Sequence, residues 1–173
     1  MPRPSPQTAA PDLRRSLPSA EDTDQIGAAL AAHLHPGDAV LLTGDLGAGK
    51  SALARACIRA LLAQDGRDEA DIPSPSFTLV QVYDCARGEI WHVDLYRLAG
   101  EDGCAELGLD DALADAICLV EWPDRLGALT PARRLDITLS MAAGDDPMID
   151  PGRWIEVRAH GSGWDAALAA LST

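Results

Sequence analysis

The feature that most constrains this chain is a glycine-rich segment of eight residues, Gly44 to Ser51, which reads Gly-Asp-Leu-Gly-Ala-Gly-Lys-Ser. It fits the pattern G-x-x-x-x-G-K-[ST] without a mismatch. The apolar run Ala39 to Thr43 before it predicts a buried strand, and the broad apolar face of Lys50 to Gln64 predicts a helix after it. A strand, a loop and a helix in this order predict a backbone cradle for phosphate groups.

The glycines of such a loop allow backbone conformations in which amide N–H groups turn inward around phosphate oxygens. The Lys50 ammonium can then reach the β- and γ-phosphates, and the Ser51 hydroxyl can ligate magnesium. Lys50 is the only lysine in the chain, and it falls where a planar guanidinium would be a poor substitute. The residues expected to bind the nucleotide are therefore Gly44, Asp45, Leu46, Gly47, Ala48, Gly49, Lys50 and Ser51.

The base of the nucleotide is indicated by elimination. Many guanine-specific proteins with such a loop read the base with an Asn-Lys-x-Asp segment. This chain has no asparagine and no second lysine, so that segment is impossible here. The sequence therefore favours ATP over GTP.

The remaining pattern predicts one α/β domain of the P-loop NTPase type, with a mixed sheet that has a parallel core, antiparallel members and flanking helices. Residues 19–173 form this domain, and residues 1–18, with Pro, Ser and Arg, are expected to be a disordered extension. The further strands are expected at 77–84, 89–95, 116–121, 135–141 and 153–159, and the further helices after Ser19, within 100–116 and at 164–171.

Two segments offer oxygen ligands before and within the predicted hairpin. Ser74-Pro75-Ser76-Phe77 suits a switch that senses the γ-phosphate, with Ser76 near the metal, or else it is a plain turn. Asp94 ends a predicted strand, where a carboxylate can hold magnesium, or else it caps the next turn. His92 lies on the same face of that strand, and we expect it to be a packed histidine.

Glu121 directly follows the apolar run Ile117 to Val120, at the carboxyl end of a predicted strand, where ligands of open α/β sheets collect. It can orient or deprotonate an attacking water and stand near the metal, or it can merely cap the next turn. Trp122 can stack on a base or ribose, or it can serve in packing.

The composition limits where the chain works and what it contacts. Its formal net charge is −13, which disfavours independent binding to nucleic acid, so any contact with RNA is expected through a partner protein. No apolar run reaches the roughly 20 residues that span a bilayer, and no secretory signal is present, so we expect a cytoplasmic protein without membrane contact.

Four segments, taken in order, resemble the TsaE family, also called the YjeE family. They are the loop at Gly44, Ser-Pro-Ser-Phe-Thr-Leu-Val at Ser74, His-Val-Asp-Leu-Tyr-Arg at His92 and Val-Glu-Trp-Pro at Val120. The resemblance spans about Ser19 to Gly161. Where the family commonly has threonine at the switch and after the loop lysine, this chain has Ser76 and Ser51, which keep the hydroxyl.

The resemblance implies an ATPase that supports a complex of TsaD and TsaB in making threonylcarbamoyladenosine at position 37 of tRNA. It implies that Lys50 and Ser51 hold phosphates and magnesium, that Ser76 is the switch residue and Asp94 a magnesium-linked residue, and that Glu121 is the catalytic acid beside Trp122. We thus expect Glu121, Lys50 and Asp94 to be catalytic, and Ser51, Ser76, Asp94 and Glu121 to serve the metal. A small-molecule kinase and a non-catalytic ATP-binding module remain alternatives.

Overall fold

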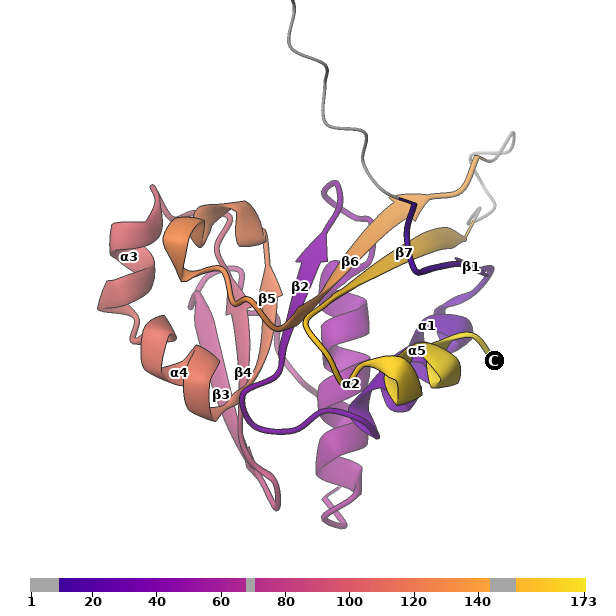
Figure 1. Cartoon of the computed structure of the whole chain (residues 1–173), viewed down its shortest axis with the longest axis horizontal. Coiled ribbons are helices and arrows are strands. Elements are labelled where there is room, and N and C mark those ends of the chain that lie inside the picture. Colours follow the sequence, from indigo (N-terminus) through magenta and orange to yellow (C-terminus); the bar gives the residue numbers. More distant parts are fainter. Residues whose placement is uncertain (1–9, 68–70, 144–151) are drawn as a thin grey trace, which may run out of the picture.

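The computed structural model of the chain describes residues 10–67, 71–143 and 152–173. Within them the chain forms one sheet of seven strands in the order β1-β7-β6-β2-β5-β4-β3, with helices on both faces (Figure 1). The strands are β1 (Leu13–Leu17), β2 (Ala39–Thr43), β3 (Val80–Cys85), β4 (Gly88–Asp94), β5 (Ile117–Glu121), β6 (Arg134–Met141) and β7 (Arg153–His160). The helices are α1 (Ala20–Ala31), α2 (Lys50–Ala63), α3 (Glu101–Glu106), α4 (Leu109–Asp115) and α5 (Asp165–Leu171).

The sheet confirms the predicted mixture of a parallel core and antiparallel members. Strand β2 pairs in parallel with both β5 and β6, and β5 pairs in parallel with β4. Antiparallel pairing adds β3 to one edge, and β7 and then β1 to the other. Because β2, β5 and β4 point the same way, their carboxyl ends lie along one edge of the sheet.

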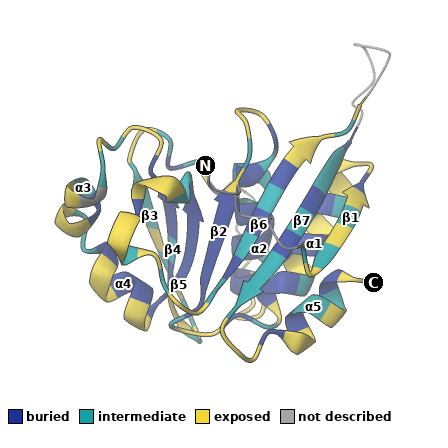
Figure 2. Ribbon diagram, turned by 45° about the horizontal axis from the view of Figure 1, so that its top comes forward, coloured by how far each residue is buried: buried dark blue, intermediate teal, exposed yellow. Residues whose placement is uncertain are grey.

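The two faces of the sheet have separate apolar clusters. Helices α1, α2 and α5 pack on one face, where Val40, Leu42 and Leu119 belong to the larger cluster. Helices α3 and α4 cover the other face at β2, β5 and β4, where Leu41 and Val120 belong to the smaller cluster. Figure 2 shows the consequence: β5 is buried throughout and β2 in all but its last residue, whereas β6 and β7 alternate along much of their length between buried and partly exposed residues. No helix in the described ranges is both long and apolar enough to cross a bilayer.

The N-terminal region differs from the expectation of a disordered extension through residue 18. Residues 1–9 lie outside the described part of the chain, but Leu13–Leu17 form β1, which pairs antiparallel with β7. Leu17 is fully buried in the larger cluster. The prediction is therefore wrong for these five residues, because β7 offers an open edge whose position is set only by the tertiary fold.

The segment before β3 also differs from its prediction as strand. Residues Phe77 to Leu79 form a turn, and the strand begins at Val80. Leu79 has a φ of 67°, and its N–H donates to the carbonyl of Pro75 at 2.7 Å. The Leu79 carbonyl in turn accepts from the N–H of Asp94 at 2.9 Å, so the turn is tied to the end of β4.

Candidate functional site

The loop between β2 and α2 depends on glycine at defined positions. Gly44, Gly47 and Gly49 have φ values of 145°, 79° and 105°, conformations that residues with a Cβ rarely adopt. A Cβ at Gly44 would lie 2.3 Å from the carbonyl oxygen of Leu139 on β6. The loop is thus pressed against the neighbouring strand, and only glycine allows that approach. Gly49 precedes the first residue of α2 and forms its N-cap, so the N-terminus of α2 faces the same loop.

Lys50 is the first residue of α2, and its side chain folds back over the loop. Its Nζ donates to the carbonyl oxygens of Gly44 and Asp45, at 2.8 Å each, and lies 4.1 Å from the ring centroid of Trp122. The residue is 4% exposed. Burial lowers the pKa of the Lys50 ammonium, while the nearby carboxylate of Glu121 opposes that shift.

Two carboxylates meet at the carboxyl edge of the sheet, each beside a hydroxyl. Asp94 ends β4 and Glu121 ends β5, and the parallel register places them opposite each other. The Ser76 hydroxyl donates to Asp94 Oδ2 at 3.0 Å, and the Ser51 hydroxyl donates to Glu121 Oε2 at 2.9 Å. Both carboxylates are buried, at 5% and 2% exposure. The arrangement brings four oxygen-bearing side chains from three elements and one turn to the phosphate loop.

Trp122 follows Glu121 in a left-handed conformation, with φ 58° and ψ 52°. This backbone is strained for a bulky residue, and such strain concentrates at functional sites. The backbone N–H of Trp122 donates to the carbonyl of Leu42 at 3.2 Å, which fixes the turn. The indole ring packs against Tyr96, with ring centroids 4.9 Å apart. The strained turn places the indole beside Lys50, where it lines the cavity and remains partly exposed.

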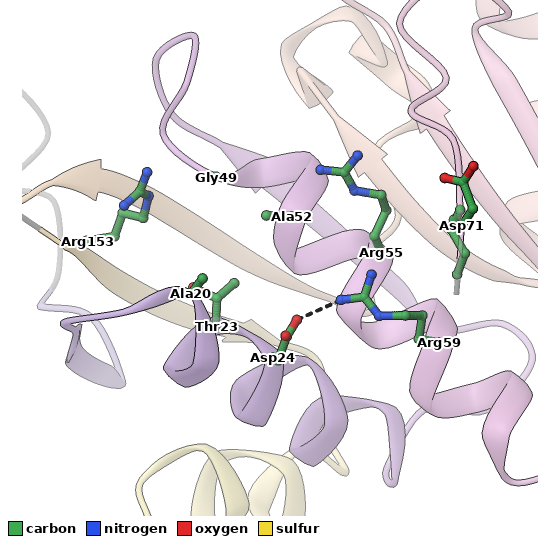
Figure 3. A pocket seen from close by; sticks show the side chains of 10 residues that line it. Ala20, Thr23, Asp24, Gly49, Ala52, Arg55, Arg59, Asp71 and Arg153 are labelled. Atoms are coloured by element: carbon green, nitrogen blue, oxygen red, sulfur yellow. Dashed lines mark hydrogen bonds and ion pairs between the residues drawn. The ribbon is translucent and has the colours of Figure 1, made fainter. Parts of the chain in front are cut away.

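These groups open into a cavity of about 320 Å³, next to a second hollow of about 360 Å³. The cavity is lined by Leu46, Gly47, Gly49, Lys50, Ser51, Ala52, Arg55, Ser76, Asp94, Glu121, Trp122 and Arg153. The second hollow shares Gly49, Ala52, Arg55 and Arg153 with it and extends between α1 and α2. In Figure 3, Arg153 from β7 and Arg55 from α2 flank Ala52, and Arg59 pairs with Asp24 at 2.7 Å farther along.

The sequence-predicted residues gather here, with a few qualifications. Lys50, Ser51, Ser76, Asp94, Glu121 and Trp122 line one cavity together with Leu46, Gly47 and Gly49. Three predicted loop residues do not line it: Gly44 and Asp45 offer carbonyls to Lys50, and Ala48 is buried.

Two arginines of the cavity were missed by the sequence analysis. Arg55 lies four residues after Ser51 on the same helix, so helical spacing alone could have identified it. Arg153 lies about a hundred residues along the chain from the loop, and only the place of β7 in the sheet brings it there.

Four side chains at the cavity, those of Ser51, Ser76, Asp94 and Glu121, present oxygen atoms, and oxygen ligands suit a hard cation such as Mg²⁺. Within the described ranges, no group of three His, Cys, Asp or Glu side chains is placed to hold a metal ion. Two carboxylates and two hydroxyls fit Mg²⁺ only as part of a larger ligand set, because this ion usually keeps waters and shares the oxygens of a bound phosphate.

The fold and the loop together place the chain in the class of P-loop proteins, in which a buried parallel strand leads through a glycine-rich loop into a helix. The comparison with protein families is specific within that class. Residues 17–147 match the family described as threonylcarbamoyl adenosine biosynthesis protein TsaE. This chain belongs to the TsaE family.

Individual relatives agree with the family assignment. The chain is 36% identical over 129 residues to the tRNA threonylcarbamoyladenosine biosynthesis protein TsaE of Rickettsia bellii, covering 75% of this chain and 87% of the relative. It is 34% identical over 148 residues to the TsaE protein of Mycobacterium tuberculosis, covering 80% and 85%. The crystal structure of the Bacillus protein YdiB superposes with a TM-score of 0.68 at 29% identity, covering 92% and 93% of the two chains.

Proposed function

We propose that this protein binds ATP with Mg²⁺ at the Gly44–Ser51 loop and hydrolyses it, and that hydrolysis supports a TsaD–TsaB complex in making threonylcarbamoyladenosine at position 37 of tRNA. The observation that carries the proposal is the meeting of Lys50, Ser51, Asp94 and Glu121 in one cavity beside a left-handed glycine loop. Family membership supports the tRNA-modification role, since the relatives carry that name.

The loop and Lys50 would hold the phosphates. Lys50 Nζ now donates to two loop carbonyls, and phosphate oxygens are stronger acceptors that would compete for the same ammonium. The loop amides and the N-terminus of α2 add further donors without another charged side chain. The second hollow adjoins the loop at Gly49 and Ala52, so the nucleoside would extend there, past Arg55 and Arg153.

The hydroxyls of Ser51 and Ser76 and the carboxylate of Asp94 would hold the magnesium ion. When bound, magnesium neutralises the charge that develops on the phosphates. Glu121 would orient the attacking water or accept its proton. The water oxygen then bonds to the terminal phosphorus, the bond to the bridging oxygen breaks, and ADP and phosphate leave.

Docking on a protein partner is supported by the surface around the site. Leu46, Phe77 and Tyr96 are large apolar side chains with exposures of 70%, 81% and 49%. Leu46 lines the cavity, and Tyr96 packs on Trp122, which also lines it. Phe77 directly follows Ser76 in the sequence, so each of the three side chains neighbours a residue of the site. Exposed apolar side chains around a site suit a protein partner, and the net charge of −13 suits a partner that itself handles tRNA.

The test compares ATP turnover with and without purified TsaD and TsaB. We expect slow turnover alone and faster turnover in the complex. Glu121→Gln should lower turnover by about 100-fold or more while ATP still binds, because one acid–base group contributes about 10²–10⁴-fold. The control is Asp124→Asn, since Asp124 lies three residues away but its side chain is 70% exposed.

Three results would overturn the proposal. One is wild-type turnover in both Glu121→Gln and Asp94→Asn. The second is rapid turnover that ignores TsaD and TsaB. The third is the appearance of a phosphorylated metabolite in place of free phosphate, which would indicate a kinase.

A further inference from the structure

We propose that His92, a histidine buried on β4, is the positioning residue for the Glu121 carboxylate. The contact is direct: His92 Nε2 lies 2.9 Å from Glu121 Oε1. Both residues are buried, at 0% and 2% exposure. The consequence for catalysis rests on the proposed ATP hydrolysis, whereas the claim about the geometry of Glu121 stands by itself.

The parallel register explains how His92 reaches Glu121. Residues two apart on a strand share a face, so His92 and Asp94 lie on the same side of β4. The register pairs His92 with Leu119 and Asp94 with Glu121. Glu121 is therefore a diagonal neighbour of His92, and the long imidazole ring bridges the two positions.

The Glu121 carboxylate is held from two directions. Its Oε1 accepts from His92 on β4, and its Oε2 accepts from the Ser51 hydroxyl at 2.9 Å on α2. Two donors on opposite oxygens fix the plane of the carboxylate as well as its position. Each oxygen keeps a further lone pair with which it can face a water molecule.

Packing alone does not account for a histidine at this place. The same face of β4 and β5 belongs to the larger apolar cluster, which contains Ile90 and Leu119. His92 Nδ1 is buried and has no hydrogen-bond partner in the described part of the chain. A buried polar atom without a partner destabilises a fold, so leucine or phenylalanine would serve packing better. What histidine adds is the hydrogen bond to Glu121.

Loss of this hydrogen bond should reduce the chemical step rather than the binding of ATP. Without His92, Oε1 of Glu121 loses its donor, and the Ser51 hydroxyl alone does not hold the carboxylate, which turns away from its place. The contacts of Lys50 with the loop carbonyls do not involve His92, and Lys50 and the loop are the groups that we propose hold the phosphates. Outer-shell partners of this kind typically contribute about 10- to 100-fold to activity.

The experiment compares the wild-type protein with His92→Phe, His92→Gln and Leu119→Ala. Glutamine carries a donor near the place of Nε2, whereas phenylalanine fills the space without one. Leu119→Ala removes packing beside His92 and leaves its hydrogen bond in place. Each protein is measured by ATP calorimetry, by single-turnover hydrolysis with TsaD and TsaB, by thermal unfolding and by crystallography of the Ser51–Glu121 contact.

We expect His92→Phe to lower the single-turnover rate about 10- to 100-fold with ATP affinity unchanged, and His92→Gln to recover most of the rate. Leu119→Ala should lower the melting temperature and leave the rate unchanged. In the crystal structure of His92→Phe, Glu121 should leave Ser51.

The proposal is overturned if Glu121 keeps its contact with Ser51 in His92→Phe. It is equally overturned if His92→Phe retains the wild-type rate, or if Leu119→Ala loses as much rate as His92→Phe. Absence of hydrolysis in the wild-type protein would refute the proposed function, and the crystal structures would still decide whether His92 positions Glu121.

Discussion

Strands β2, β5 and β4 are covered by helices on both faces, whereas β6, β7 and β1 form an antiparallel flank with helices on one face. The two parts of the sheet differ in the polar groups that they bury. The doubly covered part holds His92, Asp94 and Glu121, and α2 adds Lys50 beside it. In the flank the buried strand residues are apolar, such as Ile137 and Val157.

This difference shows that the fold places the polar residues of the candidate site and the purely apolar packing in different parts of the sheet. Charges interact more strongly where water is excluded, so the doubly covered strands suit the proposed site for phosphate groups. The flank stabilises the domain through one apolar face. It also packs against the glycine-rich loop, where Leu139 approaches Gly44 and Arg153 approaches Gly49. We therefore expect substitutions at the carboxyl ends of the doubly covered strands to affect the chemical step, and substitutions in the flank to affect stability or the fit of the ligand.

The largest expected effect follows from removing the Lys50 ammonium, which lies beside the doubly covered strands. Lys50→Ala should weaken ATP binding by about 100-fold or more, because hydrogen bonds to charged groups contribute about 1.5–3 kcal/mol each and one tenfold step is about 1.4 kcal/mol. Isothermal calorimetry measures the affinity, and circular dichroism should show an intact fold. Lys50→Arg keeps the charge but not its compact shape, so it should recover only part of the affinity. Wild-type affinity in Lys50→Ala would remove the basis for assigning chemistry to these strands.

The next effect concerns the contact between the loop and the flank. Gly44→Ala should lower the free energy of unfolding by about 2–4 kcal/mol, since its Cβ would clash with Leu139 O and its φ of 145° is strained for alanine. Gly47→Ala is the matched control: its φ is 79°, but its Cβ meets nothing within 4 Å, so it should lose only about 1 kcal/mol. Urea titration compares the two. Equal losses would mean that the flank does not constrain the loop.

A smaller effect is expected from the flank's own contribution to the site. Arg153→Ala should weaken ATP binding about tenfold and leave the hydrolytic rate at saturating ATP nearly unchanged, because Arg153 also lines the second hollow, where we place the nucleoside. Arg14→Ala is the control on β1, where the side chain is 60% exposed and pairs with Glu156 at 3.6 Å. A rate loss in Arg153→Ala as large as that of Glu121→Gln would place chemistry in the flank as well.

The smallest expected effect concerns how fast the buried cysteines react with a thiol reagent. The rate reports how often the doubly covered part of the sheet opens to solvent. Burial raises the pKa of Cys57 on α2, and that of Cys118 on β5, to about 12 each. The thiolate is the reactive form, so both should resist a thiol reagent at pH 8, whereas the partly exposed Cys85 should react first. Variants that each keep a single cysteine separate the three rates. Reaction of Cys118 as fast as Cys85 would show that this part of the sheet opens readily.

Much of the fold could be predicted from local pattern. The strand, loop and helix from Ala39 to Ala63 occur at the predicted places, because apolar periodicity and glycine punctuation are local signals. The errors arise where contacts with distant parts of the chain override the local pattern. Phe77 to Leu79 has a strand-like composition, but the contacts of Leu79 with Pro75 and Asp94 make it a turn.

The sequence by itself determined the phosphate loop, its single lysine and the acids that end two strands, since each follows from residue types at fixed spacing. Only the tertiary structure decided that β7 brings Arg153 to the loop, that Leu13–Leu17 complete the sheet, and that His92 meets Glu121. Those contacts join residues 29 or more positions apart, and strand order and register, which local sequence does not encode, set their distances.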